Sequence, residues 1–121
     1  MVGDGTVAGW NLNGAVRFER DAVDPAIFTA TTTLAATGDE QAVKLFGQAV
    51  DTAYDYNKGY WIFAPTAGAD LPTDAPGSFT LKVGPNGQPD DMKWKVSPAK
   101  AGSYVIRLNF RDNTILFTKQ N

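Results

Sequence analysis

Four aromatic residues fall within the eight-residue segment 54–61, which reads Tyr-Asp-Tyr-Asn-Lys-Gly-Tyr-Trp. The segment is too polar and too interrupted by glycine for a core strand, so we expect a loop. Aromatic faces on a loop bind pyranose rings, because the C–H groups of a sugar form an apolar, slightly positive face that complements the electron-rich ring. Asn, Asp and Lys side chains nearby would hydrogen-bond the hydroxyl groups. The pattern therefore predicts a sugar-binding platform.

The individual rings allow two interpretations, ligand contact or core packing. For Tyr54 and Tyr56 the pattern does not distinguish the two. Tyr60 and Trp61 alternate into a strand, which favours core packing. Trp10 lies between the turn residues of the segment 9–14, where a large aromatic is either a buried anchor or an exposed ligand contact. The residue pattern alone favours the anchor.

A third tryptophan, Trp94, alternates with Lys93 and Lys95. This spacing predicts a strand with the indole in the core and both lysines in solvent.

The composition excludes most catalytic chemistry. The chain has no His and no Cys, which removes Ser–His–Asp triads, Cys–His dyads and the usual zinc and iron–sulfur ligands. The carboxylate pairs Asp51/Asp55 and Asp90/Asp91 could act as a glycosidase acid and nucleophile, but any chain with 13 acidic residues offers such pairs. Neither pair has the ligand pattern of a calcium loop. We therefore expect no catalytic residue, no metal and no cofactor.

The charge and hydropathy of the sequence limit the kinds of partner that we expect for this chain. The net charge is −2, with 11 basic and 13 acidic residues interspersed, so a nucleic-acid partner is not expected. The N-terminus lacks the basic and apolar regions of a signal peptide, and no apolar run approaches the roughly 20 residues of a membrane helix. The abrupt start within strand-like sequence favours an excised mature segment.

Short β-type runs separated by Gly, Pro, Asn and Asp dominate the chain, and no amphipathic helix is convincing. The clearest element is a C-terminal hairpin, in which Tyr104, Ile106, Leu108 and Phe110 alternate with other residues before a turn at 111–113. Strands are expected at 15–19, 27–34, 41–46, 61–64, 78–83, 92–96, 104–110 and 114–118, with loops at 47–60 and 66–77. About eight short strands predict a β-sandwich in one domain spanning residues 1–121.

A series of motifs then runs in order along nearly the whole chain. They are Val2-Gly3-Asp4, Gly9-Trp10-Asn11, Phe18, Asp24-Pro25, Phe28-Thr29, Val43-Lys44-Leu45-Phe46, Trp61-Ile62-Phe63-Ala64-Pro65, Lys93-Trp94-Lys95-Val96, Ala101-Gly102-Ser103-Tyr104 and Asp112-Asn113-Thr114-Ile115. In this order they resemble the domains of SusE/SusF-type outer-membrane starch-binding lipoproteins. The Gly-Trp-Asn opening is also similar to glycogen-binding modules of the isoamylase type.

The resemblance implies an immunoglobulin-like antiparallel β-sandwich on the outer face of the outer membrane. Its membrane contact would be a lipid on an upstream Cys absent from this chain, and its partners would be a starch-like or related glycan and other outer-membrane glycan-uptake proteins. It implies binding without catalysis. The residues that match the family's sugar contacts are Trp10, Lys44 and Tyr54, so the resemblance favours Trp10 as a ligand contact.

Further residues could complete this cradle. Tyr56 or Trp61 could add an aromatic wall, and Asn11 or Lys58 could add hydrogen bonds. Two alternatives stay open. One is a structural spacer or protein-interaction module, as some domains of this family are, with Trp10 buried. The other is a hydrolase, which needs two carboxyl groups about 5 to 9 Å apart in a cleft.

Overall fold

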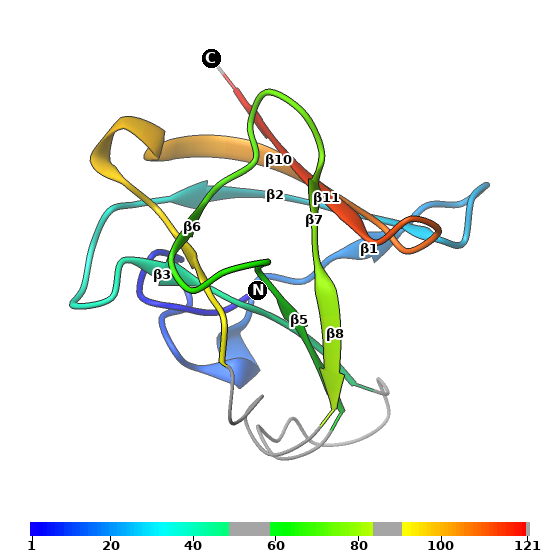
Figure 1. The fold of residues 1–121 in the computed structure, drawn as a ribbon, viewed down its shortest axis with the longest axis horizontal. Helices are drawn as coiled ribbons and strands as arrows, with labels where there is room; N and C mark the ends of the chain where they lie inside the picture. Colours follow the sequence, from blue (N-terminus) through cyan, green and yellow to red (C-terminus); the bar gives the residue numbers. More distant parts are fainter. Residues whose placement is uncertain (49–58, 84–90, 121) are drawn as a thin grey trace.

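Two layers of β-structure enclose the core in the computed structural model, which describes residues 1–48, 59–83 and 91–120 (Figure 1). The larger sheet has the strand order β1-β2-β10-β11-β7. Opposite it lie two three-stranded sheets, β3-β9-β6 and β4-β5-β8. All pairs are antiparallel except β6 with β9. The expected all-β sandwich is confirmed.

The strand bounds follow the chain. They are β1 Glu19–Arg20, β2 Ile27–Leu34, β3 Ala42–Val43, β4 Leu45–Gly47, β5 Tyr60–Phe63, β6 Ala69–Asp70, β7 Gly77–Ser78, β8 Thr80–Val83, β9 Trp94–Lys95, β10 Gly102–Asn109 and β11 Thr114–Lys119. Two short 3-10 helices, η1 Leu12–Gly14 and η3 Pro98–Lys100, complete the described elements.

The longest strands form because their side chains alternate between core and solvent. In β10 the side chains of Tyr104, Ile106 and Leu108 are buried, and in β11 those of Ile115 and Phe117. Strand β10 pairs over its full length with both β2 and β11. The predicted hairpin and the predicted strand at 27–34 are therefore confirmed.

Two predicted strands are broken in the structure. The run 41–46 divides at Lys44, because β3 pairs with β9 whereas β4 pairs with β5. The run 78–83 divides at buried Phe79, because β7 joins the large sheet and β8 joins β5. A strand that crosses from one layer to the other at a corner keeps its local pattern but changes its partners.

Smaller differences concern the edges. Of the predicted strand 15–19, only Glu19 pairs, as the first residue of β1. The predicted loop 66–77 contains the short strand β6 and, at its end, Gly77 of β7. Trp94 is 1% exposed and thus lies in the core, as expected.

Both faces of β5 are buried, which decides where the tryptophans lie. Ile62 points into the main core between the sheets, whereas Trp61 and Phe63 point to the opposite face. There Val2 and Leu12 of the N-terminal segment cover them in a second apolar cluster. This covering segment also carries Trp10.

Candidate functional site

Trp10 is presented at the surface by a closed N-terminal loop. The Gly3 N–H donates to the Gly9 carbonyl at 2.7 Å, and Gly9 takes a left-handed φ of 57° that favours glycine. The Asn11 side chain then caps η1 by accepting a hydrogen bond from the Asn13 N–H at 3.1 Å. Buried Leu12 anchors this turn, while the Trp10 side chain remains 37% exposed. The loop therefore holds an indole outward on a fixed base.

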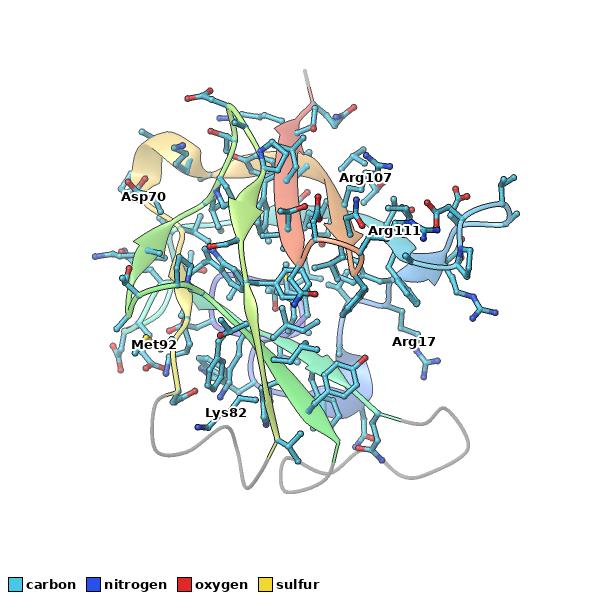
Figure 2. All side chains as sticks on the ribbon, turned by 45° about the vertical axis from the view of Figure 1, so that its right-hand side comes forward. Arg17, Asp70, Lys82, Met92, Arg107 and Arg111 are labelled. Carbon is cyan, nitrogen blue, oxygen red and sulfur yellow. The ribbon has the colours of Figure 1, made fainter. Side chains whose placement is uncertain are left out.

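Charged side chains gather beside this indole. The Lys93 ammonium lies 5.8 Å from the centroid of the Trp10 ring, within cation–π range. The same ammonium contacts a carboxylate oxygen of Asp91 at 2.9 Å and one of Glu40 at 3.3 Å. We call Trp10, Asn11, Glu40, Asp91 and Lys93 the Trp10 surface. In Figure 2 the segment that carries Asp91 and Lys93 runs along the left of the domain, where Met92 is labelled.

Lys44 lies beneath the Trp10 surface. Its side chain is 2% exposed, and its ammonium forms an ion pair with the second oxygen of Asp91. The ammonium also lies 4.0 Å from the Trp61 ring centroid and 5.7 Å from that of Phe63. Backbone hydrogen bonds of 2.8 and 2.9 Å to Val2 fix the Lys44 main chain. Contacts thus run without interruption from Trp10 through Lys93, Asp91 and Lys44 to Trp61.

The protonation equilibria of these groups are coupled. Burial lowers the pKa of Lys44, although the hydrogen bond and charge of Asp91 oppose this effect. Partial burial would raise the pKa of Asp91, but hydrogen bonds from Lys44 and Lys93 bring it below its usual value. Burial likewise works against the charge of Lys93, yet Asp91 and Glu40 raise its pKa. Asp91 is therefore held as the anion that two cations share.

The predicted site residues divide into three groups. Trp10 and Asn11 are exposed and adjacent, as a ligand surface requires. Lys44 and Trp61 correct the prediction, because exposures of 2% and 0% leave neither side chain a surface to offer to a ligand. The remaining predicted residues, Tyr54, Tyr56 and Lys58, lie outside the described residues.

Tyr60 also differs from expectation. The pattern favoured core packing, but the side chain is 36% exposed. It stands at the first position of β5, where its ring lies over Gly47, its cross-strand partner. A Cβ atom on Gly47 would overlap this ring, so a larger residue there would displace the Tyr60 side chain.

Sequence reasoning missed Lys93, Asp91 and Glu40. Lys93 was expected to be solvated, and Asp91 was considered only within a possible carboxylate pair. The usable signal is the two-residue spacing of Asp91 and Lys93, which keeps the two residues close along the chain, although neither belongs to β9. Glu40 has no such signal, because it approaches Lys93 from a distant turn.

Other chemistry finds no support in the described part of the chain. No group of three or more His, Cys, Asp or Glu side chains there could hold a metal ion. Of the carboxylates considered for a glycosidase pair, Asp91 forms ion pairs with two lysines. The other three, Asp51, Asp55 and Asp90, lie outside the described residues. Within the same ranges, no helix has the length and apolar character needed to cross a membrane.

No protein-family model, curated protein or solved structure matches the chain.

Proposed function

We propose that this domain binds a neutral glycan, with a starch-type α-glucan favoured, on the Trp10 surface and without catalysis. The observation that carries the proposal is the exposed indole of Trp10, held in place beside hydrogen-bonding groups. An indole offers a large apolar face, and covering it removes that area from water. Stacking on a pyranose would use this area.

The polar neighbours suit an uncharged ligand. Among the described residues, the charges of Lys93 and Lys44 are balanced by those of Asp91 and Glu40 within one cluster. Asn11, Glu40 and Lys93 supply both donors and acceptors for hydroxyl groups. Lys44 takes the part of a positioning residue, because it acts on the surface through Asp91.

From the resemblance to SusE/SusF-type domains we expect the domain to work on the outer face of the outer membrane. There it would capture glycan beside other glycan-uptake proteins, with a lipid anchor supplied from outside this chain.

The size of the Trp10 contribution can be estimated. An exposure of 37% of the roughly 250 Å² of a Trp side chain is about 90 Å². At about 25 cal/mol per Å², covering that area fully is worth about 2 kcal/mol. A sugar ring covers part of it, so loss of the indole should weaken binding about tenfold.

Isothermal titration with maltoheptaose and a panel of other neutral oligosaccharides tests the proposal. We expect a dissociation constant on the order of 0.1–1 mM, insensitive to salt. Trp10→Ala should weaken it about tenfold, and Trp10→Ala with Tyr54→Ala should abolish it. Tyr60→Ala is the matched control, because Tyr60 is equally exposed (36% against 37%) but lies outside the Trp10 surface. Binding that survives loss of both Trp10 and Tyr54 refutes the site.

A second candidate is a spacer or protein-interaction module. It is favoured by apolar side chains on β8, where Leu81 and Val83 are 48% and 78% exposed and share a sheet face with Tyr60. Absence of binding to every glycan in the panel, with intact folding, would favour this candidate over the first.

A further inference from the structure

The sandwich has an open pocket that lies away from Trp10. Its volume is about 240 Å³. It opens between β2 and β10 of the large sheet and β4 and β5 of the opposite layer, with the N-terminal segment up to Phe18 as a further wall. Its floor reaches the main core at Leu45, Ile62 and Leu108, all of which are buried.

Aromatic side chains dominate the walls. Phe18, Phe28 and Phe110 line the pocket from the large-sheet side, and Phe46 and Tyr60 from the opposite side. Phe28 and Phe110 are already packed edge to face, with ring centroids 5.5 Å apart. Such walls offer both ring edges and ring faces to another aromatic group.

The volume is sufficient for an aromatic molecule. An apolar cavity of about 150 Å³ lined by Leu, Ile and Phe stays dry and takes up benzene. The pocket here is open to solvent, but its larger volume is enough for a bicyclic ring, and its buried floor residues offer water few hydrogen bonds. Displacing that water favours an apolar ligand.

The charge at the mouth of the pocket determines which polar group the ligand should carry. Arg17 lines the pocket, and no lining residue within the described part of the chain is acidic. Arg17 is exposed, and Figure 2 shows its side chain extending outward from the ribbon, so its charge lies away from the apolar floor. A guanidinium has five N–H donors in a planar fork, so it can bind a carboxylate in addition to any other partner.

We propose that this pocket binds a small aryl carboxylate, with the ring system on the apolar floor and the carboxylate at Arg17. The site is separate from the Trp10 surface. The pocket proposal can therefore be tested independently of glycan binding.

The test uses 2-naphthoate and the neutral 2-naphthalenemethanol as probes, followed by amide chemical shifts of the whole chain. For 2-naphthoate we expect saturable binding with a dissociation constant on the order of 0.1–1 mM. The shifts should concentrate at Phe18, Phe46, Gln48 and Tyr60. The alcohol should bind about fivefold more weakly, because it lacks the charge-assisted hydrogen bonds.

Two variants separate the parts of the pocket. Ala15→Phe places a ring in the pocket and should abolish binding, whereas Ala99→Phe on exposed η3 is the matched control and should leave it unchanged. Arg17→Gln should reduce binding of 2-naphthoate to that of the alcohol and leave the alcohol unaffected. Trp10→Ala should have no effect on either probe.

Three results would overturn the proposal. They are no saturation at millimolar probe, shifts centred outside the pocket, or equal binding of acid and alcohol. The shift map needs no variant, so it decides the matter even where Ala15→Phe fails to fold.

Discussion

The buried pair of Lys44 and Asp91 predicts an asymmetric response to mutation. Asp91→Asn keeps the shape of the side chain but removes the counter-charge of an ammonium that is 2% exposed. Lys44→Met removes the buried charge itself and keeps an apolar side chain of similar length. In that variant Asp91 retains Lys93 at 2.9 Å.

The magnitudes follow from burial. Removing one partner of a buried ion pair typically costs about 3–5 kcal/mol, whereas replacing a buried charge by a packed apolar group is often neutral. Trp61, 4.0 Å from the Lys44 ammonium, still stabilises the cation when Asp91 is neutral, and Asp91 is 23% exposed. The expected cost of Asp91→Asn therefore falls somewhat below that range, at about 2–3 kcal/mol. For Lys44→Met we expect a change within about 1 kcal/mol.

Urea unfolding at pH 7 of the parent, the two single variants and the double variant measures these terms. In the Lys44→Met background no buried cation remains, so the cost of Asp91→Asn should fall below about 1 kcal/mol, a coupling of about 2 kcal/mol. Asp70→Asn, at an exposed carboxylate, is the control and should change stability by less than about 0.5 kcal/mol. Additive effects of the two substitutions, or a larger cost for Lys44→Met than for Asp91→Asn, would refute the reasoning.

Three further predictions concern stability. Burial lowers the pKa of the Met1 amino group from 8.0 to about 5, so the charged amine disfavours the folded state. Unfolding free energy should therefore be lowest below pH 5, rise by up to about 4 kcal/mol between pH 5 and 8, and then level off. Because the chain has no His, no side chain with an ordinary pKa titrates between pH 5 and 8. In urea unfolding experiments an Nα-acetylated chain, the control, should therefore show no such rise of the unfolding free energy with pH. Gly3→Ala should destabilise the domain by about 3 kcal/mol or more, because a Cβ there would overlap the Ala42 carbonyl oxygen at a φ of 129°; a thermal midpoint equal to that of the parent would contradict this. Tyr104→Phe removes a hydrogen bond of 2.5 Å to the Lys100 carbonyl and should cost about 1–2 kcal/mol by chemical denaturation, whereas Tyr60→Phe at the exposed ring should cost less than about 0.5 kcal/mol.

Alternation along the chain was sufficient to predict the two strands of the C-terminal hairpin. Along the central parts of β10 and β11 every second side chain is buried, and apolar residues recur with the same two-residue period in the sequence. The breaks at Lys44 and Phe79 could not be predicted in this way. Each break is a change of pairing partner between layers, which leaves the local pattern of residue types unchanged.

Burial at the candidate site was harder to predict, because it depends on distant segments. Trp61 follows a loop-like stretch, but the N-terminal residues Val2 and Leu12 cover its face of β5. Lys44 reads as a surface residue between apolar neighbours, and its counter-ion Asp91 is 47 residues away. Exposure of Trp10 favours the ligand-contact interpretation that the family resemblance suggested over the buried anchor.

Among the described residues, Trp10 and Lys44 are connected through Lys93 and Asp91, which the family resemblance did not include. A ligand on Trp10 meets Lys44 through Asp91 and Lys93. Removing Lys44 leaves Lys93 with both Asp91 and Glu40, so the Lys93 ammonium loses orientation but not its partners. Removing Lys93 takes away the ammonium that lies 5.8 Å from the centroid of the Trp10 ring. The influence of Lys44 on glycan affinity should therefore be smaller than that of Lys93, which is the reverse of the order expected if Lys44 touched the sugar.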